Sequence, residues 1–136
     1  MAELARKIER IAKHALWAII GFFFGKKKSP PLPINFTSAS SVLVIRTDRL
    51  GDVVLSTPVY ESIKKSFPHL RVSAVVSRSN VPILTNNPNV DEIIPFDPKN
   101  LGTTIKQLRH NRFDIAFTLN KKFSAIASLL ALISKA

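Results

Sequence analysis

The sequence predicts an α/β domain with a Rossmann-like parallel sheet over residues 42–136, preceded by a basic segment and a linker. From residue 42 onward, short runs of β-branched apolar residues alternate with segments of helical periodicity, which is typical of a parallel sheet. The first run, 42–45, ends in a polar loop containing Gly51 and Asp52, and an apolar segment follows. We interpret this order as strand, turn and helix. It places the loop at the carboxyl edge of the sheet, where ligands bind in open α/β folds.

The four expected strands are short, apolar and rich in valine and isoleucine. They are 42–45, 72–76, 93–96 and 115–119. Segments that can hold helices separate them, which predicts parallel pairing with right-handed crossovers. We expect the first strand, extended to Arg46, to lie centrally in the sheet.

The first expected helix follows the polar loop. Val59, Ile63 and Phe67 recur every four residues and form its inner stripe, and lysines lie outside that stripe. Thr57 is the expected N-cap and Pro58 the expected first residue, since a hydroxyl accepts from free N–H groups and proline has no N–H to leave unpaired. A start closer to the glycine-aspartate pair of the loop is the alternative.

Three further helices are expected along the chain. Two prolines restrict 80–89 to a short helix, whereas 101–111 shows an apolar stripe through Ile105 and Leu108. The third helix, 123–133, is almost entirely apolar and has no strand after it. We therefore expect the chain to stop before its fold is complete.

Residues 1–28 have a composition of their own, with seven lysines and arginines against two acids. Their apolar core, 15–25, has 11 residues, which is well short of the ~20 needed to span a bilayer. We expect an amphipathic helix at the membrane interface, with aromatic side chains among the acyl chains and lysines at the headgroups. The residues expected there are Trp17, Phe22, Phe23, Phe24, Lys26, Lys27 and Lys28. The alternative is a helix packed on the protein's own surface or on a partner.

Residues 29–41 form a linker, because three prolines near its start prevent a helix from running through it.

Composition argues against several classes of site. The chain has no cysteine and three isolated histidines, so no metal site is expected. With four glycines and neither a G-x-G-x-x-G nor a P-loop pattern, no cofactor-binding phosphate loop is expected. The net charge of +11 is the single feature in favour of nucleic acid, and without an RNA-binding motif or basic recognition helix we expect none to bind.

The loop 46–52 carries two arginines and two acids. Gly51 fits either a turn with positive φ or the close approach of a ligand. Asp52 at a helix start has a purely structural interpretation, in which it caps free N–H groups and complements the helix dipole. The arginines Arg46 and Arg49 then neutralise the acids.

These residues also carry a resemblance. The stretch VLVIRTDRLGDVVLSTPVYESIKKSFP, with its D-x-x-G-D-x-x-x-x-T-P pattern from Asp48 to Pro58, resembles the start of the glycosyltransferase family 9 catalytic domain, which includes the ADP-heptose:lipopolysaccharide heptosyltransferases. The resemblance continues through NPNVDEIIPFD, LRHNRFDIAFTLN and FSAIASLLALIS. It implies a GT-B architecture, inverting transfer of a heptose or related sugar without a metal or cofactor, and Asp52 as the catalytic base. The implied substrate-binding residues are Thr47, Asp48, Arg49, Gly51, Lys122 and Ser124. The chain departs from many relatives at 118–122, where Thr118 and an Asn-Lys-Lys run replace an acid and a glycine loop.

The resemblance also implies partners and a location. The acceptor would be a lipopolysaccharide-type glycolipid, and a nucleotide-sugar donor would bind only through a missing C-terminal domain. This chain alone would then lack turnover. The expected location is cytoplasmic, peripheral on the inner face of the bacterial inner membrane and attached through anionic lipid. The alternative is a noncatalytic membrane-associated fragment of such an enzyme.

Overall fold

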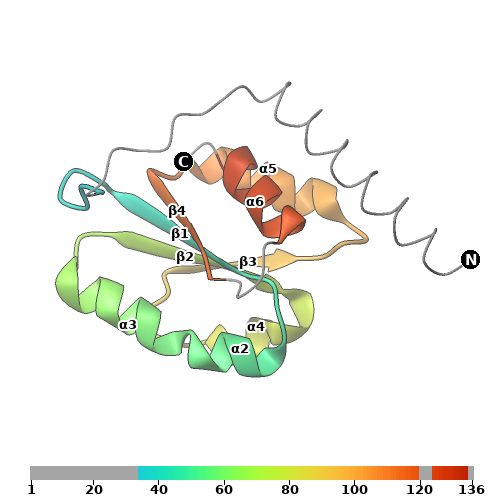
Figure 1. The fold of residues 1–136 in the computed structure, drawn as a ribbon, viewed down its shortest axis with the longest axis horizontal. Coiled ribbons are helices and arrows are strands. Elements are labelled where there is room, and N and C mark those ends of the chain that lie inside the picture. The colour runs from blue at the N-terminus through green and yellow to red at the C-terminus, as the bar shows by residue number, and fades with distance from the viewer. Residues whose placement is uncertain (1–33, 120–123, 135–136) are drawn as a thin grey trace, which may run out of the picture. The chain divides into compact units, whose positions relative to one another are not determined.

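The computed structural model describes residues 34–119 and 124–134, which form a parallel sheet with helices on both faces (Figure 1). The strands are β1 (Ser41–Arg46), β2 (Arg71–Ser77), β3 (Glu92–Phe96) and β4 (Ile115–Thr118). Their order is β3-β2-β1-β4, and every pair is parallel. The predicted Rossmann-like sheet with a central first strand is confirmed. The membrane residues expected in 1–28, and Lys122, lie outside the described residues.

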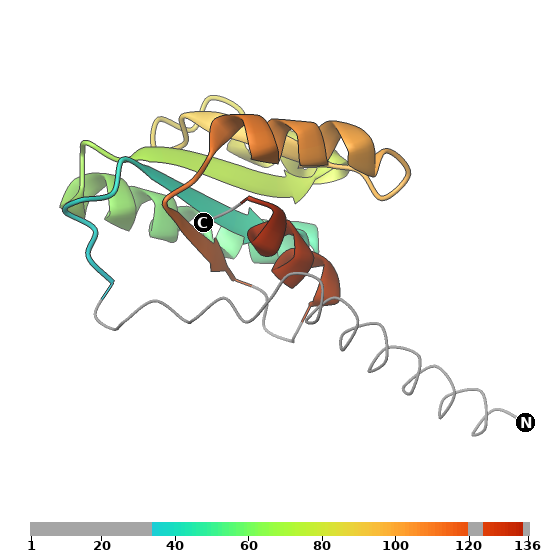
Figure 2. The same ribbon diagram turned by 90° about the horizontal axis from the view of Figure 1, so that it is seen from above.

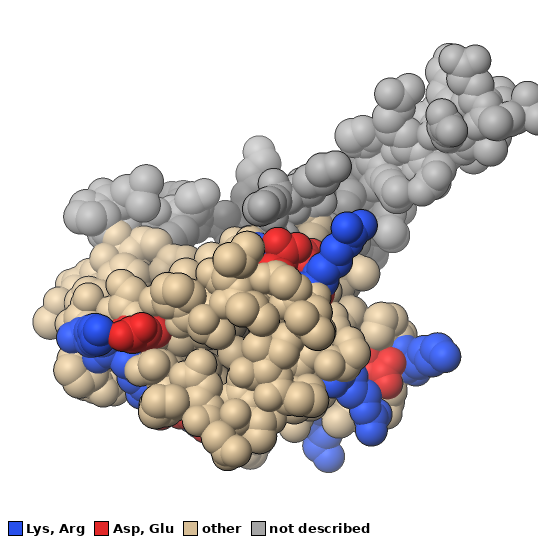
Figure 3. Space-filling view, turned by 90° about the horizontal axis from the view of Figure 1, so that it is seen from below, with Lys and Arg blue, Asp and Glu red and all other residues tan. Residues whose placement is uncertain are grey.

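The helices divide between the two faces of the sheet (Figures 1 and 2). The first group is α2 (Leu50–Leu55), α3 (Thr57–Ser66), the 3₁₀ turn η1 (Arg78–Asn80) and α4 (Val81–Leu84). The second group, on the opposite face, is α5 (Leu101–Asn111) and α6 (Ala125–Ile133). Seen from the side of the first group, charged side chains lie mainly at the margins of an uncharged central surface (Figure 3). None of the described helices is long and apolar enough to cross a bilayer.

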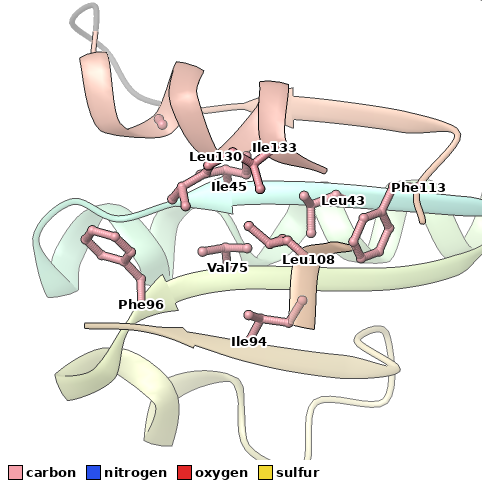
Figure 4. Packing of buried hydrophobic residues seen from close by; sticks show 10 residues of the cluster. Leu43, Ile45, Val75, Ile94, Phe96, Leu108, Phe113, Leu130 and Ile133 are labelled. Atoms are coloured by element: carbon pink, nitrogen blue, oxygen red, sulfur yellow. The ribbon is translucent and has the colours of Figure 1, made fainter. Parts of the chain in front are cut away.

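The central strands are buried on both faces, as expected for a parallel sheet covered by helices. Leu43 and Ile45 of β1 pack with α5 and α6 in one core cluster, together with side chains from β2 and β3 (Figure 4). Val42 and Val44 are equally buried and, by the alternation of side chains along a strand, face α2 and α3. Arg46 continues this second set, so its side chain leaves β1 toward the layer that contains α2.

The start of α3 differs from the prediction. Thr57 is its first residue and Ser56 its N-cap, so the prediction of Thr57 as N-cap was wrong. The reason is that α2 directly precedes α3, and the Thr57 hydroxyl donates to the Val54 carbonyl oxygen (2.8 Å) instead of capping. The alternative start near the glycine-aspartate pair describes α2. Tyr60, outside the predicted stripe, is the fully buried residue of α3, whereas Val59 and Ile63 are half-buried.

Candidate functional site

The loop that joins β1 to α2 is held in place by the segment that follows β2. The Ser77 hydroxyl donates to the Thr47 carbonyl oxygen (2.9 Å), and the Asn80 side-chain amide donates to the Asp48 carbonyl oxygen (2.9 Å). Asn80 is itself buried. Because both acceptors are backbone atoms, the path of the loop at the carboxyl edge is fixed whatever its side chains do.

The guanidinium of Arg46 lies between the two acids of this loop. Its Nη2 is 3.1 Å from Oδ1 of Asp52, and its Nη1 is 3.7 Å from Oδ2 of Asp48. The Arg46 side chain is only 6% exposed, against 25% for Asp52 and 32% for Asp48. A cation this deeply buried needs a counter-charge, so the arginine and the acids form one charged unit.

Asp52 is the third residue of α2, and it does not cap that helix. The N-cap is Arg49, which makes no side-chain capping bond, and its carbonyl oxygen accepts from the backbone N–H groups of Asp52 (3.0 Å) and Val53 (3.2 Å). The Asp52 carboxylate instead faces Arg46, so the capping interpretation of this residue was wrong. A carboxylate in the first turn still gains from the helix dipole.

Gly51 does not adopt a positive φ, and a Cβ placed on it would meet no atom within 4 Å. Of the two alternatives for Gly51, the turn with positive φ is therefore not the one observed. Neither backbone conformation nor packing within the described residues requires glycine here. Close approach of a ligand stays a prediction.

Tyr60, the fully buried residue of α3, lies close enough to Arg46 to be influenced by its charge. Burial raises the pKa of its hydroxyl, and the nearby Ser56 hydroxyl and Arg46 charge oppose that rise only in part. The Ser56 hydroxyl donates to the Val53 carbonyl oxygen (2.7 Å). Within the described residues, the Tyr60 hydroxyl and the Arg46 Nε are buried and have no hydrogen-bond partner of good geometry.

A pocket of about 260 Å³ opens beside the charged unit. Its lining consists of Arg46, Asp52, Leu55, Ser56, Val59 and Leu119. It is smaller than the ~300–1,000 Å³ of pockets that hold drug-sized ligands, so it suits one part of a ligand. The arrangement offers a carboxylate as hydrogen-bond or proton acceptor, an arginine behind it and apolar walls around the entering group.

The other predicted site residues have different surroundings. Thr47 and Asp48 are half-buried in the loop, and Arg49 is exposed. Ser124 caps α6, where its hydroxyl oxygen accepts from the N–H of Ala127 (3.3 Å), so it has a structural role. In the part of the chain that the structure describes, no three acidic or histidine side chains gather as metal ligands.

The expected neutralisation of the loop acids is confirmed for Arg46, which pairs with both Asp52 and Asp48. Sequence reasoning missed the importance of Tyr60 and Asn80 for the site. Tyr60 lies one position from the predicted stripe, so only the exact rotation of α3 reveals it. Asn80 acts across 32 residues of sequence, and no local pattern indicates such a contact.

The fold and site together define a Rossmann-like α/β domain with a carboxylate-lined pocket at its carboxyl edge. No protein-family model matches the chain. Among curated proteins, the chain is 28% identical over 82 residues to lipopolysaccharide heptosyltransferase 3 of Escherichia coli K12, covering 54% of this chain and 24% of that protein. It is 27% identical over 109 residues to the lipopolysaccharide core heptosyltransferase OpsX of Haemophilus influenzae, covering 77% and 30%.

Solved structures agree. A family 9 glycosyl transferase from Veillonella parvula superposes with a TM-score of 0.63 at 26% identity, covering 69% of this chain and 29% of that one. The E. coli ADP-heptose lipopolysaccharide heptosyltransferase II gives a TM-score of 0.59 at 25% identity, covering 70% and 28%. The predicted resemblance to heptosyltransferases and family 9 glycosyltransferases is confirmed. The match spans less than a third of the length of each of these relatives.

Proposed function

We propose that this chain forms the acceptor-side part of an inverting glycosyltransferase that acts in lipopolysaccharide core biosynthesis. The observation that carries the proposal is the Asp52 carboxylate, which lines a pocket at the carboxyl edge of the sheet and is held by Arg46 at 3.1 Å. The similarity to lipopolysaccharide heptosyltransferases supports the reaction class. The transferred sugar is a heptose or a related sugar.

In the proposed reaction Asp52 acts as general base toward an acceptor hydroxyl. The hydroxyl oxygen attacks the anomeric carbon of the donor, its proton passes to the Asp52 carboxylate, and the nucleoside diphosphate leaves with the bonding electrons. A single displacement of this kind inverts the anomeric configuration. The pocket admits one ring-sized part of the acceptor, and Leu55, Val59 and Leu119 supply its apolar walls.

The nucleotide sugar would be bound by a C-terminal domain in a GT-B arrangement. Two features support this division. The sequence has no glycine-rich phosphate-binding pattern, and the pocket of about 260 Å³ is too small for a nucleotide and an acceptor together.

We further propose that residues 1–28 hold the protein on the cytoplasmic face of the inner membrane. The support is compositional, namely an apolar, aromatic block that ends in three lysines and a net charge of +5 over the segment. Such an anchor would keep the acceptor site close to a glycolipid acceptor.

The decisive variant is Asp52→Asn, assayed in the polypeptide that carries this domain together with a nucleotide-sugar domain. Turnover should fall by ~10² or more, in the range of lost general-base catalysis, while circular dichroism stays unchanged. Glu61→Gln is the matched control, because Glu61 is an acid in an ion pair with Lys65 on α3 but does not line the pocket. Near-normal turnover of Asp52→Asn would leave Asp52 as an ion-pair partner of Arg46 and nothing more.

A further inference from the structure

Two carboxylates share one buried guanidinium, and the proposed base is only one of them. Asp52 is the nearer partner of Arg46 at 3.1 Å, and Asp48 is the second at 3.7 Å. The Nε of Arg46 is buried and makes no hydrogen bond within the described residues, so both acids act on the Nη nitrogens. The catalytic role of Asp52 does not by itself require a second acid on this arginine.

Proton uptake by Asp52 changes the charge balance of this group. Before the reaction Arg46 faces two negative charges, and after Asp52 accepts a proton it faces one. If Asp52 were its sole partner, the proton would leave a buried cation uncompensated, which is strongly unfavourable. Protonation of Asp52 would then be opposed by the same arginine that holds it in place.

We propose that Asp48 is a positioning residue for transfer, which keeps Arg46 paired while Asp52 carries the acceptor proton. This inference rests on the proposed role of Asp52 as base. Asp48 acts through Arg46 and touches no reacting atom. It lowers the energetic cost of the protonated state of Asp52, and it keeps the guanidinium in the same place before and after proton transfer.

The backbone around Asp48 suits this role because it is fixed from outside the loop. The Asp48 carbonyl oxygen accepts from Asn80, and the preceding carbonyl oxygen, that of Thr47, accepts from Ser77. The Asp48 side chain can thus remain beside Arg46 without support from Asp52. On an unrestrained loop, the Asp48 carboxylate would move away from Arg46 into the solvent once Asp52 became neutral.

The first experiment measures kcat and KM of Asp48→Asn in the two-domain polypeptide. We expect kcat to fall about tenfold or more with KM changed less than about twofold, the pattern of an interaction that matters only in the transition state. Asp48→Glu should recover part of the loss. The matched control is Asp97→Asn, since Asp97 also lies 3.7 Å from an arginine, Arg78, whose side chain is 78% exposed and needs no protein counter-charge. That control should stay within about twofold of the unmodified enzyme.

The second experiment is a double-mutant cycle with Arg46→Met. Without the buried cation Asp48 has no charge to balance, so Asp48→Asn should cause no further loss of kcat in that background. Where Asp48→Asn alone fails to fold, Arg46→Met and Arg46→Met/Asp48→Asn are compared directly, and a lower kcat of the double variant overturns the inference. An equal additional loss in the Arg46→Met background would overturn the inference, and so would a raised KM with unchanged kcat, which would place Asp48 on the acceptor.

The outcomes separate the inference from the function on which it rests. Full activity of Asp52→Asn would refute the base assignment itself. An inactive Asp52→Asn together with a fully active Asp48→Asn would keep the base and overturn the role of Asp48 alone.

Discussion

The side chain of Arg46 leaves β1 on the same face of the sheet as Val42 and Val44, because alternate residues of a strand point to the same side. That face is covered by α2 and α3, which explains how a cation at the end of an apolar strand meets Asp52 of α2. The arginine therefore lies between a buried core and an open pocket. Its stem packs within the apolar layer, and its charged end belongs to the site.

The contribution of the buried Tyr60 hydroxyl to stability can be tested by substitution. Its buried hydroxyl lacks a hydrogen-bond partner of good geometry within the described residues, so Tyr60→Phe should leave the free energy of unfolding unchanged or raise it by about 1 kcal/mol. Urea unfolding at neutral pH measures this difference. A loss of more than about 1 kcal/mol would show that the hydroxyl is bonded after all.

A second prediction concerns stability at alkaline pH, and it follows from the pKa of Tyr60, which burial raises above 10.0. Below pH 10 the phenol is neutral in both states and its full contribution to stability is present. Above pH 10 the unfolded chain ionises first, so stability falls as pH rises toward the folded pKa. Tyr60 is the single tyrosine, so tyrosinate absorbance reports on it alone, and Tyr60→Phe should remove this part of the alkaline loss.

At the scale of elements, the short helix α2 has an inner face that packs on the domain and an outer face that is exposed. Val53 is buried and Asp52 turns toward Arg46, while Leu50, Val54 and Leu55 are exposed. The Ser56 N–H, bonded to the Asp52 and Val53 carbonyl oxygens, ends α2 before α3 begins. Asp52 in the first turn of α2 therefore lies on the inner side of the helix, next to the end of β1.

Periodicity located most elements but not this break. The helix over 101–111 matches α5, because one apolar stripe on a polar helix leaves a single way to pack it. The junction of α2 and α3 was not predicted, since Thr57-Pro58 is equally compatible with a cap or with a first turn. The loop acids were recognised from their spacing. That both acids pair with the same arginine, Arg46, depends on the tertiary structure, which the spacing of residues in the sequence does not reveal.

A second element-scale feature joins the starts of β1 and β4. One carboxylate oxygen of Asp114 accepts from the backbone N–H groups of Ser40 (2.9 Å) and Ser41 (3.0 Å) and from the Ser41 hydroxyl (3.0 Å). The Ser40 N–H is the main cause that holds the pKa of Asp114 below its usual value of 3.8, and the bonds from Ser41 add to it. The bonds from Ser41, the first residue of β1, reach Asp114, which is 73 residues later in the chain and directly precedes β4.

Asp114→Asn should therefore be less stable than the unmodified chain at pH 7. Because the folded pKa is lowered, the contribution of this carboxylate is present above the unfolded pKa and is lost as pH falls through the folded pKa. The stability difference between the two proteins should shrink from about pH 5 to pH 2, as urea unfolding over that range would show. Asp97→Asn is the control for loss of one negative charge. An unchanged difference across that range would mean that the bonds to Asp114 do not depend on its ionisation.

At the scale of the whole molecule, the basic excess is unevenly distributed. Residues 1–28 carry a net charge of +5, and the other 108 residues carry +6. On the face of the domain formed by α2, α3 and α4, charges lie mainly at the margins (Figure 3). The concentration of charge in the N-terminal segment favours an anionic surface as its partner over a general attraction of the whole chain.

Removal of residues 1–28 tests the proposed membrane attachment. The basic residues contribute about 1 kcal/mol each near an anionic surface, and burial of even part of Trp17 and the three phenylalanines adds several kcal/mol at roughly 25 cal/mol per Å². The full chain should therefore co-sediment with vesicles that contain anionic lipid, whereas a variant starting at Ser29 should remain in the supernatant. A variant with Lys26, Lys27 and Lys28 changed to glutamine separates the electrostatic from the hydrophobic contribution, because it keeps the aromatic block. It should bind more weakly than the full chain, and its binding should depend less on salt. Equal, weak binding by all three proteins would indicate that this segment packs on protein, and the acceptor site would then need another means of reaching a membrane glycolipid.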